Sequence, residues 1–211
     1  MELSKLQKLG GISLIIGSTL FTAYSILFFT ILPVNSVRHD ITLAILNQNW
    51  IWIAMLAFFG VILMIFGFTA VYSKLYMESG IIGFLGYLFV EIAYLLQACK
   101  VTWEIFLYPV IAGNQSSILL FKDSVLKNSN LIIAFKNVAS ITIFIGIVLF
   151  CIALVRSKEF PKSAGLLIFT GALLYGLGPI LSIFIAIGGI VILSIGCLIA
   201  GLKLIKQVRN I

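Results

Sequence analysis

Residues 162–203 read KSAGLLIFTGALLYGLGPILSIFIAIGGIVILSIGCLIAGLK, an apolar run with a lysine at each end and no other charge. As one helix these 42 residues would extend about 63 Å, about twice the roughly 30 Å hydrocarbon core of a bilayer. Gly178-Pro179 and Ser182 mark a break near the middle of the run. The run therefore predicts a hairpin of two membrane-spanning helices.

Comparable apolar runs recur along the whole chain of 211 residues, of which 62% are hydrophobic and 10% are charged, with a mean hydropathy of +1.20. Soluble domains carry about a quarter charged residues, so soluble nucleotide-binding folds, disulfide scaffolds and disordered chains are excluded. We expect an all-α, polytopic helical bundle that forms a single integral membrane domain over 1–211. The six predicted spans are about 9–32, 50–72, 81–108, 130–155, 164–180 and 183–203.

The basic residues predict the orientation of these spans. With the N-terminus inside, nine lysines and arginines fall on the cytoplasmic side, and the outer loops hold only Arg38, Lys122 and Lys127. Cytoplasmic loops carry the excess of basic residues, so both termini are expected to be cytoplasmic. The net charge of +7 then points to lipid headgroups of the bilayer as anionic partners, with no nucleic acid. The compact loops favour an inner (plasma) membrane of a prokaryote.

A glycine pattern repeats along the chain. Gly60-Val61-Ile62-Leu63 is followed by Gly67 and Lys74, and Gly189-Ile190-Val191-Ile192 is followed by Gly196 and Lys203 at identical spacing. Small residues seven apart fall on one helix face, where they let two helices approach closely. The pattern predicts three tandem two-helix hairpins of one orientation, over about 8–74, 77–158 and 162–203. The alternative is chance similarity between glycine-rich helices.

Ionisable side chains inside the spans are the candidate functional residues, because such groups are costly at membrane depth and usually face protein or water. At about 100° per residue, the third span places its polar side chains on one half of the helix. Lys136 of the fourth span enters the membrane at the same level as the outer end of this stripe. The predicted polar seam comprises Glu91, Tyr94, Gln97, Lys100, Glu104 and Lys136.

Depth separates these groups into two sets. Glu91 lies about 15 Å into its span, near the midplane, where burial favours a neutral carboxyl group. It is either a proton carrier or a structural hydrogen-bonding partner. Lys100 and Glu104 are one turn apart near the outer boundary, and with Lys136 they are expected to form an outer cluster. The alternative for that cluster is a structural ion pair beside a snorkelling lysine.

Signatures of catalysis are missing from the sequence. The single histidine, His39, lies in a predicted outer loop, and no H-E-x-x-H, G-x-S-x-G or P-loop pattern occurs, so we expect neither an enzyme nor a bound metal or cofactor. The polar seam favours a small transporter or permeation protein for a small solute or ion, coupled to protons through Glu91. The alternative is a non-catalytic accessory, regulatory or immunity-type membrane protein that binds lipid, another membrane protein or a second copy of itself.

Overall fold

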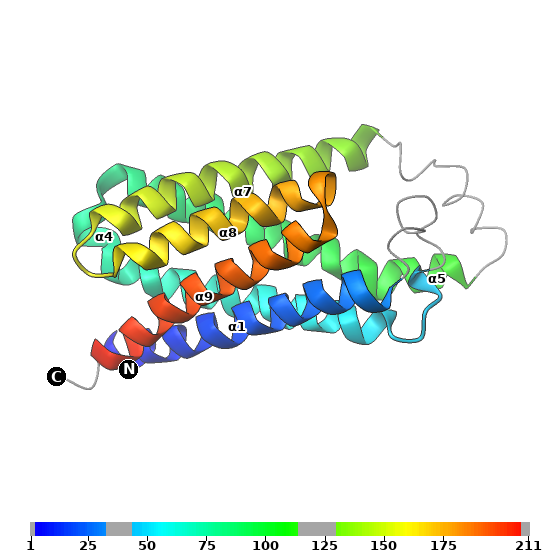
Figure 1. Ribbon diagram of the computed structural model, residues 1–211, viewed down its shortest axis with the longest axis horizontal. Coiled ribbons are helices and arrows are strands. Elements are labelled where there is room, and N and C mark those ends of the chain that lie inside the picture. Colours follow the sequence, from blue (N-terminus) through cyan, green and yellow to red (C-terminus); the bar gives the residue numbers. More distant parts are fainter. Residues whose placement is uncertain (1–2, 33–43, 114–129, 208–211) are drawn as a thin grey trace.

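The structure, a computed structural model, describes residues 3–32, 44–113 and 130–207. Every element in these ranges is a helix, which confirms the all-helical prediction for them, and the helices run lengthwise beside one another in one bundle (Figure 1). The helices are α1 (Leu3–Ile31), α4 (Trp50–Thr102), a short π-helix (Trp103–Leu107), α5 (Tyr108–Ala112), α7 (Asn130–Arg156), α8 (Lys162–Leu181) and α9 (Ile183–Gln207).

Four helical stretches are long and apolar enough to cross a membrane, which indicates a membrane-embedded protein. They are Lys5–Ile31, Trp50–Ile111, Ile133–Arg156 and Ile183–Lys206. The apolar part of α8, Lys162–Gly178, is shorter. The sequence predicts six spans: the two expected at about 50–72 and 81–108 both lie in the stretch Trp50–Ile111, which bends at Gly80, and the one expected at about 164–180 lies in the shorter apolar helix.

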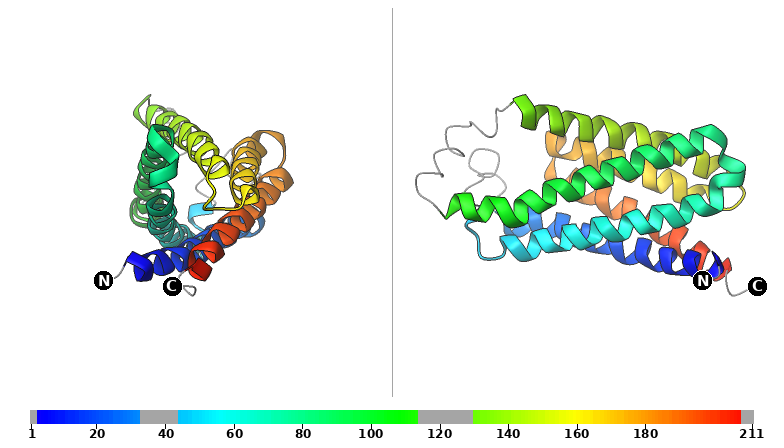
Figure 2. Two further views of the ribbon diagram at one scale, coloured as in Figure 1. Left: turned by 90° about the vertical axis from the view of Figure 1, so that its left-hand side faces the viewer. Right: turned by 180° about the vertical axis from the view of Figure 1, so that it is seen from behind.

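α4 doubles back on itself at Gly80. This residue has φ 55° and ψ −155°, a conformation that glycine adopts without a steric penalty. The rings of Tyr72 and Tyr87 stack across the bend with centroids 4.3 Å apart, and those of Phe68 and Tyr94 do so at 5.5 Å. The first arm of α4 (50–79) therefore runs antiparallel to the second arm (81–102), as the right-hand view of Figure 2 shows.

Glycines bring helices into close contact at equivalent places in each of the three predicted hairpins. A Cβ atom added to Gly17 of α1 would lie 2.8 Å from the Met64 nitrogen and 2.9 Å from the Gly60 oxygen. Gly86 and Gly171 lie against the backbone nitrogens of Phe150 and Leu193 in the same way. In each case the facing helix carries a glycine of its own, which is Gly60, Gly146 or Gly189, and the contacted nitrogen belongs to the residue four positions after it. The contact therefore has the same register in α1 with the first arm, the second arm with α7, and α8 with α9.

The α8–α9 pair is shorter than the others at one end of the bundle. α8 ends ten residues after Gly171, whereas α1 continues for fourteen residues after Gly17. α9 begins six residues before Gly189, whereas α7 begins sixteen residues before Gly146. At about 1.5 Å per residue, the tip of the α8–α9 pair therefore lies roughly 6–15 Å short of the ends of α1 and α7. Figure 1 shows the α8–α9 connection stopping short of the adjacent end of α7.

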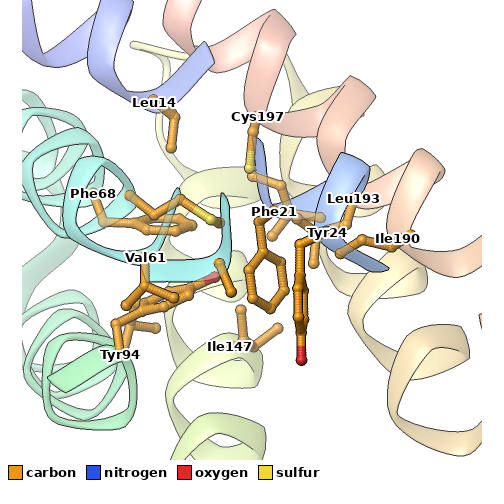
Figure 3. Close-up of a cluster of buried hydrophobic side chains, with 14 of the residues drawn as sticks. Leu14, Phe21, Tyr24, Val61, Phe68, Tyr94, Ile147, Ile190, Leu193 and Cys197 are labelled. Atoms are coloured by element: carbon orange, nitrogen blue, oxygen red, sulfur yellow. The ribbon is translucent and has the colours of Figure 1, made fainter. Parts of the chain in front are cut away.

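The buried core lies between α1, α4, α7 and α9. Figure 3 shows it around Phe21 and Tyr24, with Phe68 on one side and Ile190 and Leu193 on the other. α9 also packs closely on α1, where a Cβ atom at Gly11 would lie 2.7 Å from the Gly201 oxygen. α7 and α8 pack against each other less closely than the two helices of each glycine-lined pair.

We expect Gly17→Ala to lower the thermal unfolding midpoint in detergent, because its methyl group would collide with the backbone of the facing helix. Overpacking of this kind typically costs about 1–3 kcal/mol. Gly188→Ala is the matched control, since no atom lies within 4 Å of a Cβ atom at Gly188, and its midpoint should not fall. Equal midpoints for the two variants would contradict the contact.

Candidate functional site

Most of the predicted polar seam lines a cavity at the recessed end of the bundle. This charged cavity, of about 370 Å³, lies between α4, the π-helix, α5, α7 and α1. The structure therefore brings Lys100, Glu104 and Lys136 together, as the sequence predicts for an outer cluster. The polar and charged residues that line the cavity are Gln97, Lys100, Glu104, Tyr108, Lys136 and Ser140, with the indole of Trp50 beside them.

Lys100 and Glu104 form an ion pair in the wall of the charged cavity. The Lys100 Nζ atom lies 3.3 Å from Glu104 Oε1. Glu104 is only 6% exposed, whereas the Lys100 side chain remains 37% exposed. The carboxylate is therefore the buried partner, and the ammonium group faces the cavity.

The backbone around Glu104 is held by a tryptophan from the other arm of α4. In the π-helix the Tyr108 N–H donates to the Trp103 oxygen, five residues earlier. By that pattern the Glu104 oxygen would accept from residue 109, but Pro109 has no N–H group. The Trp50 Nε1–H donates to this carbonyl instead, at 2.7 Å. Trp50 thus joins the first arm of α4 to the π-helix where they border the charged cavity.

A central cavity of about 440 Å³ continues from the charged cavity into the bundle. The two cavities share Gln97, Lys100, Ala139 and Ser140. Tyr94 and Tyr175 also line the central cavity, and the Tyr175 hydroxyl oxygen lies 3.2 Å from Ser25 Oγ. Polar groups therefore extend from the charged end toward the middle of the bundle.

A lateral groove of about 310 Å³ between α7 and α8 adjoins the central cavity. The groove and the central cavity share Ser140, Ile143, Ile147, Ala172 and Gly176. Apart from Ser140, every residue that lines the groove is apolar, and Phe144 and Leu177 are exposed on the surface of the bundle. The charged cavity, the central cavity and the lateral groove are therefore contiguous.

The structure places Glu91 apart from the rest of the predicted seam, since it lines none of these three spaces. Its Oε1 atom is 3.2 Å from Thr69 Oγ1, where the two arms of α4 pack together. Thr69 is exposed and Glu91 and Tyr87 are half-buried. Of the five seam residues that the sequence places on one half of the third span, Tyr94, Gln97, Lys100 and Glu104 line the charged or central cavity, while Glu91 turns toward the outer surface of the bundle.

Thr69 joins Glu91 to Tyr87. Thr69 Oγ1 lies 2.9 Å from the Ile65 oxygen, 3.2 Å from Glu91 Oε1 and 3.2 Å from the Tyr87 hydroxyl. An ionised Glu91 accepts the Thr69 hydroxyl proton while Tyr87 donates to Thr69, and a protonated Glu91 donates to Thr69, which then donates to Ile65. Both protonation states of Glu91 therefore have a hydrogen-bonding partner in this cluster.

Sequence reasoning missed three contributors to the site: the Trp50 contact, Tyr175 and the lateral groove. Pro109 was the available signal for the first, because it removes a backbone donor from a helix. Within residues 3–32, 44–113 and 130–207, no group of three His, Cys, Asp or Glu side chains is arranged to hold a metal ion, and His39 lies outside these ranges. No protein-family model, curated protein or solved structure matches this chain.

Removing Lys100 should destabilise the fold more than removing Glu104. We expect Lys100→Gln to destabilise the fold by about 3–5 kcal/mol, because it leaves the buried Glu104 carboxylate unpaired. Glu104→Gln should cost less, since the Lys100 ammonium is partly exposed, and the double variant should recover most of the loss. Equilibrium unfolding in detergent measures all three; additive losses would show that the pair is not coupled.

Glu91→Gln should remove a pH dependence of stability. A glutamine amide N–H donates to Thr69 as a protonated carboxyl does, so the variant should unfold at the wild-type midpoint or above it. If the fold prefers neutral Glu91, that stability is present at low pH and lost as the pH rises, in the wild type alone. Thermal scans of wild type and variant over the same pH series measure this. A variant less stable at every pH would assign Glu91 a purely structural role.

Proposed function

We propose that this chain is a six-span protein of the inner (plasma) membrane, with its hairpins in one orientation and both termini in the cytoplasm. The support is that α1 begins, α9 ends, α4 bends and α7 connects to α8 at the same end of the bundle (Figure 1). Basic residues mark the cytoplasmic side of membrane proteins. Those near this end include Lys8, Lys74, Arg156, Lys158, Lys162, Lys203 and Lys206.

Within this topology we propose a non-catalytic transport or permeation function for a small solute. The observation that carries the proposal is the contiguity of the charged and central cavities through Lys100 and Ser140. A stable bundle without such a function would fill this space with side chains, because protein interiors are close-packed. The polar groups along the path, Gln97, Tyr94 and Tyr175, replace some of the hydration that a solute loses on entry.

Glu91 is the residue that we propose for proton coupling. It is one helical turn from Tyr94, which lines the central cavity, and its carboxyl group is linked through Thr69 to the first arm of α4. A change in the protonation of Glu91 would alter the hydrogen bonds that join the two arms. Because Trp50 and Lys100 lie on these same arms, such a change would reach the walls of both cavities.

One observation favours the alternative of an accessory protein. The cluster of Thr69, Tyr87 and Glu91 places hydrogen-bonding groups at the surface of the bundle at membrane depth, where a polar helix of another membrane protein would find partners. Under that hypothesis, Glu91→Gln would abolish co-purification of a partner and leave the cavity dry. Under the transport hypothesis, the cavity is wet whether or not a partner is bound.

Cysteine labelling distinguishes these alternatives. In a background with Cys99, Cys151 and Cys197 replaced by alanine, we expect Ser140→Cys to react with a membrane-impermeant maleimide added from outside to intact cells. Ile141→Cys is the matched control, because Ile141 is the next residue of α7 and is 59% exposed on the bundle's outer surface, where lipid excludes the reagent. If Ser140→Cys reacts no faster than Ile141→Cys, the cavity is closed or dry and the transport proposal is wrong.

A further inference from the structure

We propose that α7 and α8 bind one phospholipid of the bilayer, with an acyl chain along their junction and the headgroup phosphate at Arg156. This inference goes beyond the proposed transport function and does not need it. The proposed topology serves only to name the leaflet, which is the cytoplasmic one. Three features carry the inference: a continuous apolar groove, an arginine at its end, and a helix junction that small residues leave open.

A second groove continues the lateral groove toward the end of the bundle where α7 connects to α8. This arginine groove, of about 400 Å³, has walls that include Ile152, Leu166 and Arg156. It shares Val148 and Phe169 with the lateral groove. Ile152 and Leu166 are exposed on the surface of the bundle. The two grooves therefore form one apolar channel along the α7–α8 junction, open to the side, which we call the joined groove.

The two other junctions between neighbouring hairpins are closed. Between the arms of α4, the ring of Tyr72 stacks on that of Tyr87 with centroids 4.3 Å apart. Between α1 and α9, a Cβ atom at Gly11 would lie 2.7 Å from the Gly201 oxygen. The α7–α8 junction is therefore the place where the bundle offers an apolar chain a groove instead of a closed seam.

Small residues of α8 account for the opening. Gly171 of α8 makes the same backbone contact as Gly86 of the second arm of α4. The residue after Gly86 is Tyr87, which fills its junction, whereas the residue after Gly171 is Ala172. Ala172 and Gly176 both line the lateral groove. Because protein interiors are close-packed, space left beside two membrane helices is filled by lipid chains.

Arg156 marks the end of the joined groove at the membrane surface. Its side chain is exposed, and no described residue forms an ion pair with it. Nearby acids have other partners: the Glu159 carboxylate lies 3.8 Å from the Lys74 Nζ atom. Glu78 accepts a hydrogen bond from the Lys158 backbone N–H at 2.9 Å. The guanidinium group of arginine suits a phosphate, to which it can donate two parallel hydrogen bonds.

The length of the joined groove matches the depth of one leaflet. Half of the roughly 30 Å hydrocarbon core is about 15 Å, which corresponds to about ten residues of a helix. Counted from Arg156, ten residues along α7 reach Gly146, which is followed by Ile147 and Val148 in the wall of the lateral groove. A chain that begins at Arg156 therefore covers the arginine groove and enters the lateral groove before it reaches the midplane.

Native mass spectrometry of the full chain in detergent tests the headgroup contact, with phosphatidylglycerol and phosphatidylcholine of identical chains as probes. We expect wild type to retain one phosphatidylglycerol about fivefold more strongly than phosphatidylcholine, the effect of one basic residue at an anionic headgroup. Arg156→Gln should remove this preference. Lys206→Gln is the matched control, because it removes the same charge from an exposed position of α9 at the same end. Equal losses in the two variants would indicate diffuse attraction and overturn the proposal.

Val148→Phe tests the chain contact. Val148 lines both grooves, so the larger ring should fill their junction and reduce retention of both lipids severalfold. Val138→Phe is the matched control, since Val138 belongs to the same helix, is 56% exposed and lines neither groove. Thermal unfolding verifies that each variant is folded. Leu166→Asn, which makes an exposed wall of the arginine groove polar, tests the same contact without added volume.

Two other results would overturn the proposal. If Arg156→Gln, Val148→Phe and Leu166→Asn all retain both lipids as wild type does, the lipid only coats the bundle. If Val148→Phe releases a protein that co-purifies with wild type and leaves lipid retention unchanged, the joined groove holds a helix of that protein. Retention that falls in the groove variants and not in the two controls supports the site whether or not Ser140→Cys is labelled, so the test does not depend on the transport proposal.

Discussion

The close approach of helix backbones at glycines is the constraint on which the rest of this structure depends. In a bilayer the hydrophobic effect does not drive helices together, because lipid tails are as apolar as leucine side chains. Association depends on van der Waals contact, which is strongest where no side chain separates the backbones. Gly17, Gly86 and Gly171 provide such contacts at the same register in three helix pairs. Once these pairs are fixed, the depth of every other side chain is fixed with them, including that of Lys100 and Lys136.

The candidate site lies where this close packing is relaxed. α7 and α8 belong to different pairs; Gly165 of α8 lies against Cys151 and Val155 of α7, but farther along the two helices are separated by the lateral groove. The α8–α9 pair is also shorter, so neither of its helices reaches the adjacent end of α7. In the same region Pro109 interrupts the hydrogen-bonding pattern of the π-helix, and the Trp50 indole supplies the missing donor. Tight packing along each pair and loose packing between two of them together produce a rigid bundle with an internal space.

The sequence predicted much of this arrangement because its signals are local or periodic. Apolar length predicted helices, glycine spacing predicted faces at which helices approach closely, and the ionisable residues predicted an outer cluster, whose three members line the charged cavity. The tightness of the bend in α4 was missed, because Lys74, Ser79 and other polar residues there resemble a longer loop in composition, whereas they remain helical up to Gly80. The position of Glu91 was missed because the angles of side chains around one helix do not show which neighbouring helix packs against each side of it. Thr69, which bonds to both Glu91 and Tyr87, is 22 residues away from Glu91 along the chain, and only the bend at Gly80 brings it within reach.

The ion pair between Lys100 and Glu104 is better explained by the cavity than by stability. A buried salt bridge is often no more stabilising than apolar residues of similar volume, because the loss of hydration offsets the attraction. At this depth, two leucines would serve the bundle at least as well. Glu104 instead lowers the cost of holding a lysine inside the membrane and keeps its ammonium group at the junction of the charged and central cavities. Lys136 of α7 lines the same cavity. The arrangement therefore holds a paired lysine at a fixed depth, where the charged cavity meets the central cavity and close to the lateral groove.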